Sequence, residues 1–339
     1  MHVQLENVVA IVTLVSLILY ALMGGADYGG GVWDLLATGP RAKRQRDVIA
    51  DAMGPIWEAN HVWLILVIVL LFTAWPKAFG AMMTALHVPL TAMLLGIVFR
   101  GTAFVFRKYD SKKDAVQRRW SQIFGITSAF TPLMQGTTLG ALATGTIRVG
   151  EDGMIRTGFF AGWLTPFALS CGVFALALFA FLAAVYLTVD AGKDSEVQND
   201  FRIRAIISGV ALAPVAAFVF FTSKVGAPEM FRGLTHWWAP LLLLWTSLFA
   251  ASTLFALWRR HYDFARVAAI GQVTMILAGW CLAQYPHLVY PDLTISNAAA
   301  PEVTLRLLVV ALGIGALVLL PSLYYLFRIF KGSATPDTH

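Results

Sequence analysis

Residues 160–187 read FAGWLTPFALSCGVFALALFAFLAAVYL, and this stretch decides the fold class. It lies within a longer segment, residues 157–189, that contains no Asp, Glu, Lys or Arg. A helix that rises about 1.5 Å per residue needs about 20 apolar residues to cross the hydrocarbon core of a bilayer. The stretch is therefore predicted to be a transmembrane helix.

Apolar runs of comparable length recur along the whole chain and predict an all-α, polytopic membrane protein with nine transmembrane helices. Hydrophobic residues make up 58% of the 339 residues and charged residues 13%, against about 45–50% and about 25% in soluble domains. This composition excludes a soluble enzyme, and the alternating pattern of an outer-membrane barrel is missing. The predicted spans are residues 8–23, 57–75, 79–99, 120–143, 160–187, 203–222, 237–258, 264–283 and 303–327.

Lysine and arginine are distributed unevenly between the loops that join these spans. Alternate loops, counted together with the C-terminus, hold 19 of the 25 Lys and Arg residues, the other loops hold five, and Arg306 lies inside the last span. Cytoplasmic loops of membrane proteins are enriched in Lys and Arg. We therefore predict an external N-terminus and a cytoplasmic C-terminus. The formal net charge of +6 reports this orientation, so no nucleic-acid partner is expected.

A glycine-rich segment with an acid, GGADYGGGVWD at residues 24–34, follows the first predicted span. It has no GxGxxG or GxxxxGK[ST] pattern, so a phosphate-binding loop is not favoured. We expect instead a locally opened helix end that packs closely on a neighbour. Gly25 and Gly29, like Gly136 and Gly140 in the fourth span, have the spacing that lets two helices approach closely. Asp27 is expected to face protein or water rather than lipid.

A second acidic segment, DAMGPIWEANHVWLI at residues 51–65, opens the second span. Glu58 lies near the helix start, where the helix dipole favours a negative charge. The alternative is that Glu58 takes up protons from the cytoplasm and shares an entrance with Asp27. Asp51 precedes Glu58 by seven residues, roughly on the same helix face, and could feed it.

Histidine and arginine side chains provide the remaining candidates. His61 and His87 are predicted at different depths, which disfavours a haem held by both and leaves a single-histidine haem open. The sequence has no HExxH motif and no Cys/His set with metal-ligand spacing, so no metal site is expected. In FRGTAFVFRKYD at residues 99–110, Arg100 and Arg107 share one helix face. Arg100 is placed either to set the membrane boundary or to pair with an acid or a cofactor carboxylate.

These segments together resemble subunit II of the cytochrome bd quinol oxidases, including the cyanide-insensitive branch. The resemblance covers essentially the whole chain. It rests on GADYGGG, PIWEANHVWLI, the AWP of residues 74–76, FRGTAFVFR, and QGTTLGALATG at residues 135–145.

The resemblance implies a heterodimer in the bacterial cytoplasmic (inner) membrane that oxidises quinol and reduces oxygen to water with cytoplasmic protons. Haem b and haem d would lie in the larger subunit I with the quinol site, so no residue of this chain would be catalytic. Some family members hold a structural quinone or lipid in this subunit, and small accessory subunits are further candidate partners. The single membrane domain, residues 1–339, would comprise four-helix halves at 1–143 and 144–284, then a peripheral ninth helix and tail at 285–339.

The resemblance also assigns expected roles to single residues. The acid after Trp in the family's PxWD segment lies on a proposed proton route and corresponds here to Glu58, where the family usually has Asp. The expected proton-path residues are Glu58, Asp27, Trp57 and Asp51. Polar or charge pairing near the partner or its haem propionates is expected from Arg100, Arg107, His61 and Asn60.

Two positions depart from the family pattern. DGFDxGxG reads GGADYGGG at residues 24–31, which keeps the second acid as Asp27 and loses the first Asp and the Phe. Val105 stands where an acid is common within FRGxAFEFR, so one titratable group near Arg107 is missing.

Two other functions are weighed against the oxidase subunit. A secondary carrier would bind a cation through Asp27 and Glu58, but the centres of the spans carry few charges. An independent b-type cytochrome would need His61 or His87 as its haem ligand.

Overall fold

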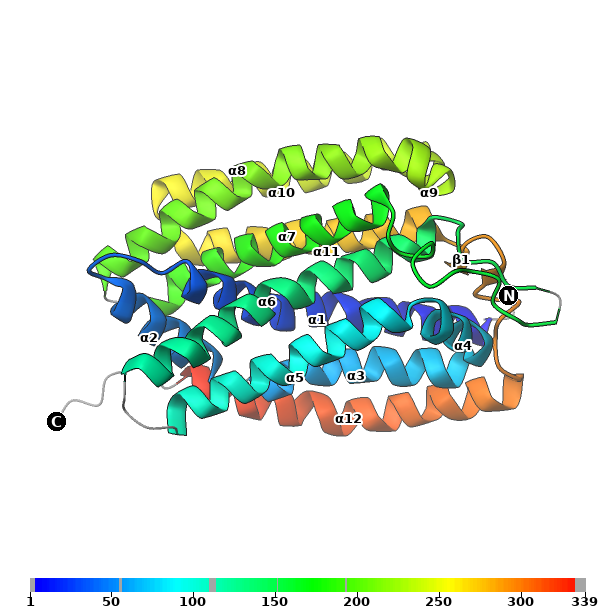
Figure 1. The fold of residues 1–339 in the computed structure, drawn as a ribbon, viewed down its shortest axis with the longest axis horizontal. Coiled ribbons are helices and arrows are strands. Elements are labelled where there is room, and N and C mark those ends of the chain that lie inside the picture. Colours follow the sequence, from blue (N-terminus) through cyan, green and yellow to red (C-terminus); the bar gives the residue numbers. More distant parts are fainter. Residues whose placement is uncertain (1–3, 55–56, 110–113, 151, 193, 333–339) are drawn as a thin grey trace.

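The computed structural model describes residues 4–54, 57–109, 114–150, 152–192 and 194–332, which form twelve helices and one two-stranded sheet. The long helices lie side by side in one bundle, and short elements cover its two ends (Figure 1). Among the described residues, eight helices are long and apolar enough to cross a membrane. They are α1 (Leu5–Leu35), α3 (Trp57–Ala74), α5 (His87–Tyr109), α7 (Pro166–Asp190), α8 (Ser195–Gly226), α10 (Ala239–Arg259), α11 (Tyr262–Gln284) and α12 (Glu302–Gly332).

The ninth long helix, α6 (Asp114–Ala143), packs between α5 and α7 and runs along the same bundle. It is less apolar than the others because several hydroxyl side chains lie along it. Thr131 and Thr137 donate hydrogen bonds to the backbone carbonyls four residues before them, which satisfies these hydroxyls inside the helix. With α6, the described residues contain nine long helices, of which eight meet the length and apolarity of a membrane span; the prediction of nine transmembrane helices therefore depends on α6.

Two predicted boundaries are wrong. The span predicted at 79–99 is divided between α4 (Pro76–Ala85) and α5, because the backbone at Leu86 leaves the helical region at φ −112° and ψ 18°. The span predicted from residue 160 begins only at Pro166. Thr165 caps it there by accepting a hydrogen bond from the Ala168 N–H at 3.2 Å, and proline is favoured in the first helical turn.

The expectation that residues 24–34 form an opened helix end is also wrong, since α1 continues through them to Leu35. Glycines are tolerated here because neighbouring helices occupy the space of their missing side chains. A Cβ on Gly29 would lie 1.9 Å from the carbonyl oxygen of Phe179 in α7. A Cβ on Gly31 would lie 2.1 Å from the Ser128 hydroxyl in α6. The predicted close packing is therefore present, and it occurs within this chain.

Helix α7, which contains most of the apolar stretch at residues 160–187, forms the centre of the bundle. It contacts α1, α6, α8 and α11, and two-thirds of its most apolar window (67%) is buried. Gly136 and Gly140 of α6 lie against it, and a Cβ on Gly136 would be 2.3 Å from the Cys171 carbonyl oxygen. Small residues thus permit close contact of α7 with both α1 and α6.

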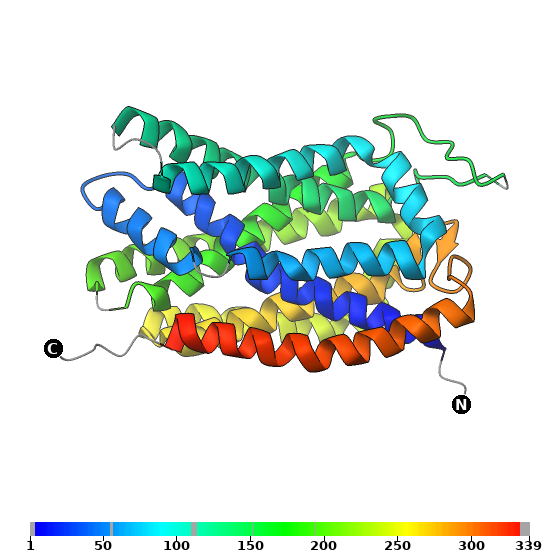
Figure 2. The same cartoon turned by 90° about the horizontal axis from the view of Figure 1, so that it is seen from below.

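The outer helices expose apolar side chains. Only 11% of the apolar window of α8, 17% of that of α10 and 6% of that of α12 is buried. α12 contacts α1 and α3 at the periphery, so its apolar surface suits lipid or another membrane subunit (Figure 2).

The two ends of the bundle differ in charge. We call the end that carries α2 (Ala42–Met53), the α7–α8 connection and the α10–α11 connection the Arg-rich end. There Arg41 pairs with Asp200 at 2.7 Å, which ties α2 to α8. The hydrogen bond from Arg41 to the Asp200 carboxylate raises the pKa of the guanidinium.

The opposite end carries α4, α9 (Pro228–Leu234) and an antiparallel pair of short strands, β1 (His287–Val289) and β2 (Leu293–Thr294). Arg148 pairs there with Asp292 at 3.0 Å. α1 begins at this end and α12 finishes at the Arg-rich end, so the described chain starts and ends on opposite sides (Figure 2).

Candidate functional site

Asp27 and Asn60 form a buried polar pair between α1 and α3. Asp27 is 5% exposed and Asn60 is 1% exposed. The Asn60 side-chain amide donates a hydrogen bond to Asp27 Oδ2 at 2.7 Å. Among the described residues, the side-chain oxygen Oδ1 of Asn60 has no hydrogen-bond partner. The pair places an acid within an apolar helix, faced by protein as the sequence predicts.

Glu58 lies on the other side of α3 from this pair. Its side chain is exposed, whereas Asn60, two residues later, is buried. Two residues correspond to a rotation of about 200° around a helix, so the two side chains point in nearly opposite directions. Glu58 and Asp27 therefore lie on different sides of α3, and the helix itself stands between them.

Asp51 does not share a helix with Glu58, which corrects the argument that placed them on one face. α2 ends at Met53 and α3 begins at Trp57, and Pro55 and Ile56 lie outside the described residues. Asp51 is exposed at the Arg-rich end. The break in the helix removes the seven-residue register on which the expectation depended.

His61 belongs to a series of hydrogen-bonded side chains that joins α3, α1 and α6. Its Nδ1 lies 2.9 Å from the Trp57 carbonyl oxygen and its Nε2 lies 3.2 Å from the Tyr28 hydroxyl. Because a carbonyl can only accept, Nδ1 carries the proton and Nε2 accepts from Tyr28. The Tyr28 hydroxyl in turn accepts a hydrogen bond from the Tyr20 hydroxyl at 3.3 Å, and the Tyr20 hydroxyl accepts one from the Gln135 amide at 2.6 Å. Both ring nitrogens of His61 are thus occupied within this chain.

Trp57 packs at the start of α3. Its ring stands edge-on to His61 at 6.3 Å and lies against Phe104 of α5 at 6.2 Å, measured between ring centroids. A Cβ on Gly101 would lie 3.4 Å from the Trp57 ring. These contacts hold the first turn of α3, which carries Glu58, against α5.

Arg100 is buried inside the chain, with 3% of its surface exposed. Its Nε donates to the Ser128 hydroxyl at 3.1 Å, and its guanidinium lies over the rings of Tyr28 at 4.7 Å and Phe124 at 5.3 Å. These aromatic faces attract the cation, so within the described residues they are neighbours of Arg100 in addition to Ser128. Arg100 is enclosed by α1, α5 and α6, and its Nη2 has no hydrogen-bond partner among the described residues.

Arg107 has its acid partner within the chain. It donates to Asp34 at 2.7 Å, and the Asp34 side chain is fully buried. Arg46 of α2 lies 3.9 Å from the same carboxylate. The sequence analysis did not single out Asp34, although Asp27 and Asp34 have the same seven-residue spacing as Arg100 and Arg107. Because the two acids lie on α1 and the two arginines lie on α5, this shared spacing could have indicated that Asp34 pairs with Arg107.

His87 lies far from this group. It begins α5 near the opposite end, where its Nδ1 is 2.8 Å from the Thr84 carbonyl oxygen and its ring packs on Phe159. Within the part of the chain that the structure describes, no three His, Cys, Asp or Glu side chains are grouped as a metal site requires.

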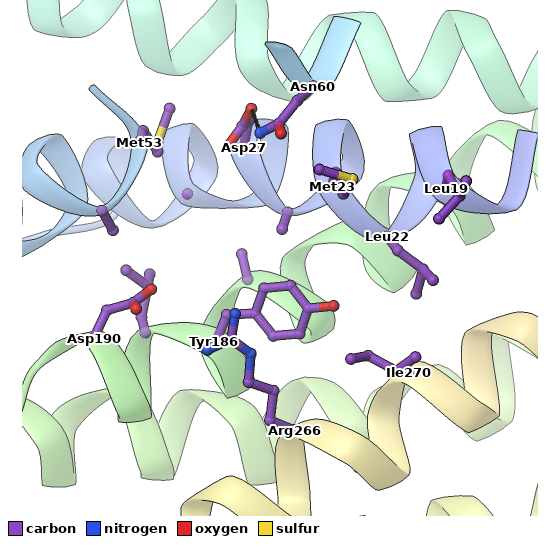
Figure 3. Close-up of a pocket in the computed structure, with 15 residues that line it drawn as sticks. Leu19, Leu22, Met23, Asp27, Met53, Asn60, Tyr186, Asp190, Arg266 and Ile270 are labelled. Atoms are coloured by element: carbon purple, nitrogen blue, oxygen red, sulfur yellow. Dashed lines mark hydrogen bonds between the residues drawn. The ribbon is translucent and has the colours of Figure 1, made fainter. Parts of the chain in front are cut away.

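A cavity of about 330 Å³ adjoins Asp27 between α1, α2, α3, α7 and α11. Asp27 and Asn60 line one wall, and Tyr186, Asp190 and Arg266 line the facing wall (Figure 3). The sequence analysis missed these last three residues because each lies near a helix end, where charged and aromatic side chains are ordinary. Only the packing of α7 and α11 on α1 brings them to Asp27.

Residues 5–330 match the profile of the family described as cytochrome bd terminal oxidase subunit II. The cytochrome bd ubiquinol oxidase subunit 2 of Bacillus subtilis strain 168 is 26% identical over 310 residues, which cover 87% of this chain and 88% of the relative. The cytochrome bd-I ubiquinol oxidase subunit 2 of Escherichia coli K12 is 30% identical over 214 residues, 61% of this chain and 55% of the relative.

A solved structure shares the fold. A chain in the structure of bd oxidase from Geobacillus thermodenitrificans aligns with a TM-score of 0.76 and 23% identity, over 97% of this chain and 99% of that chain.

Proposed function

Because this chain belongs to the cytochrome bd terminal oxidase subunit II family, we propose that it stabilises the haem-bearing subunit of the oxidase and helps deliver cytoplasmic protons for oxygen reduction. Membership makes the chain a subunit of a quinol-oxidising oxidoreductase in the bacterial inner membrane, whose complex contains haem and acts with a subunit I partner. The carrier and the independent cytochrome are set aside on the same ground.

Haem b and haem d are proposed to lie in the partner. The histidines of this chain do not fit an axial ligand well, since His61 has both nitrogens hydrogen-bonded and His87 lies near the opposite end of the bundle. Haem supplies the electron-transfer and oxygen-binding chemistry where it is bound. This chain would contribute protons and packing.

The observation that carries the proton proposal is the buried Asp27–Asn60 pair beside a cavity that reaches towards the Arg-rich end. An acid buried in a membrane-spanning helix is costly and is rarely kept without a function. The amide of Asn60 holds the Asp27 carboxylate in place, and the carboxylate is the group that would take up and release a proton.

Glu58 supports a second, outward-facing role. It is exposed on α3, a helix that contacts the peripheral α12, and an ionised side chain there would meet lipid unless another subunit or water covers it. We infer that the partner docks over this face and that Glu58 passes protons towards it. Asp51 would act as an acceptor at the surface, and Trp57 would position the first turn of α3.

The proton role is tested by Glu58→Gln and Asp27→Asn in the purified complex, with Glu302→Gln as the matched control. Glu302 is also an exposed acid in a first helical turn, but it lies at the opposite end. We expect each of the first two variants to lower quinol-driven oxygen consumption at least about tenfold, since a positioned proton-transfer group typically contributes about 100-fold or more. Unchanged rates at unchanged haem content in both variants would show that the proton role is wrong.

The partner role is tested by affinity purification of the tagged chain from mild detergent. Reduced-minus-oxidised spectra are recorded on the eluate and on the separated chains. Co-elution of a larger chain with b- and d-type haem bands, with this chain colourless alone, is the expected result. Haem bands that stay with this chain after separation would contradict it.

A further inference from the structure

We propose that the cavity between the two four-helix halves is a water-filled proton entrance to Asp27, with Asp190 as its outer carboxylate. This inference rests on the proposed function, that the chain delivers protons, and adds an entry route that does not pass through Glu58. The route joins α1 and α3 of the first half to α7 and α11 of the second.

The cavity is large enough to hold water. Its volume of about 330 Å³ exceeds the space of one water molecule many times over. Water occupies such a space only where polar groups can bind it, and an apolar cavity stays dry. The lining of this cavity includes five polar side chains, of which two are carboxylic acids.

Asn60 gives independent evidence for water. Its side chain is 1% exposed and lines the cavity, and its amide nitrogen already donates to Asp27. Its carbonyl oxygen lacks a donor among the described residues. A buried acceptor left without a donor costs about 1–3 kcal/mol, and a bound water would supply the missing hydrogen bond.

The facing wall connects the cavity with the Arg-rich end. Asp190 is the last residue of α7 and is half-buried. The guanidinium carbon of Arg266 of α11 lies 4.8 Å from the centroid of the Tyr186 ring, so the guanidinium group lies on this wall of the cavity (Figure 3). Asp190 thus stands between the aqueous end of the bundle and the interior, while Asp27 occupies the other wall.

The titratable groups that face the cavity come from three helices. They are Asp27 of α1, Tyr186 and Asp190 of α7, and Arg266 of α11. α2 and α3 contribute Ala52, Met53 and Asn60, which do not titrate. Two carboxylates and one guanidinium favour a hydrated space, in which water can carry a proton from Asp190 to Asp27.

Hydration is tested with Ala26→Cys in the intact oxidase, labelled by a small, water-soluble methanethiosulfonate reagent. Ala26 lines the cavity. Ala251→Cys on the exposed face of α10 is the control, because lipid would cover it in the membrane. We expect labelling above the wild-type background for Ala26→Cys only. Absence of labelling, as an acyl chain in the cavity would produce, overturns the proposal.

Proton entry is tested with Asp190→Asn and Ala26→Leu, the latter to fill the cavity, and with Ala251→Leu as the control. We expect a several-fold lower rate of oxygen consumption and a larger solvent deuterium isotope effect in the first two variants, and recovery in Asp190→Glu. A structural defect would lower haem content instead and would not change the isotope effect.

The outcomes separate this inference from the proposed function. If Asp27→Asn or Glu58→Gln lowers turnover while Asp190→Asn and Ala26→Leu leave both the rate and the isotope effect unchanged, the cavity route is wrong and the proton function stands. If none of the four variants changes turnover, the proton function itself fails.

Discussion

Asp34 and Arg107 form an ion pair that is nearly closed off from solvent. The Asp34 side chain is fully buried and Arg107 retains 17% of its side-chain surface. Removing one partner of a buried pair leaves the other charge without compensation, whereas removing both is much less costly. The pair therefore joins α1 to α5 strongly.

We predict that Asp34→Asn lowers the stability of the purified oxidase by about 3–5 kcal/mol. Asp152→Asn is the control, because the Asp152–Arg156 pair is exposed and such pairs contribute about 0–1 kcal/mol. Thermal denaturation in detergent measures both. The double variant Asp34→Asn with Arg107→Gln should recover part of the loss, and no recovery would argue against a paired charge.

At the scale of elements, the contact between α1 and α7 depends on the absence of side chains. Gly25 and Gly29 face the Phe179 ring and its carbonyl oxygen, and a Cβ on Gly25 would lie 2.6 Å from that ring. Gly136 and Gly140 make the corresponding contact from α6. α7 is buried because small residues on two neighbours let its bulky side chains fit between them.

We predict that Gly29→Ala destabilises the chain by about 1–3 kcal/mol or more, since overpacking a close contact forces the backbone to shift. The added methyl group would meet the Phe179 carbonyl, which is backbone and cannot turn away. Gly313→Ala is the control, because nothing lies within 4 Å of a Cβ there. Equal yields of assembled oxidase from both variants would contradict this account.

At the scale of the whole molecule, ion pairs at the Arg-rich end join segments that are far apart in the sequence. α2 and the residue before it pair with the α7–α8 connection and α8 through Arg41–Asp200, through Arg44–Asp194 at 3.3 Å, and through Arg44 with Glu196. These basic residues are also the ones that predict a cytoplasmic side. The same charges therefore serve both topology and packing.

We predict that green fluorescent protein fused after His339 is fluorescent, because the distribution of Lys and Arg predicts a cytoplasmic C-terminus. Alkaline phosphatase inserted at Gly153, in the exposed connection between α6 and α7 at the opposite end, should be active for the complementary reason. The two reporters are measured in whole cells. The reverse pattern would invert the orientation and remove the cytoplasmic position of the Arg-rich end.

Much of the fold follows from sequence because membrane insertion is a local property. A run of about 20 apolar residues must become a helix in lipid whatever its neighbours are. Eight long helices of the described residues follow from that rule. The glycines of residues 24–34 favour an opened helix end, but α1 continues through them. Only the neighbours Phe179 and Ser128, which occupy the space above those glycines, explain why the helix continues.

The sequence by itself determined that this is a polytopic helical membrane protein, because long apolar runs must form helices in lipid. Its motifs also resemble those of the oxidase subunit family, whose profile matches residues 5–330. Tertiary structure alone decided which polar groups meet. Asn60 reaches Asp27, Arg107 reaches Asp34, and Asp190 shares a cavity with Asp27 because separate helices pack together. Such partners are set by the packing of side chains between helices, which the order of residues within one helix does not contain.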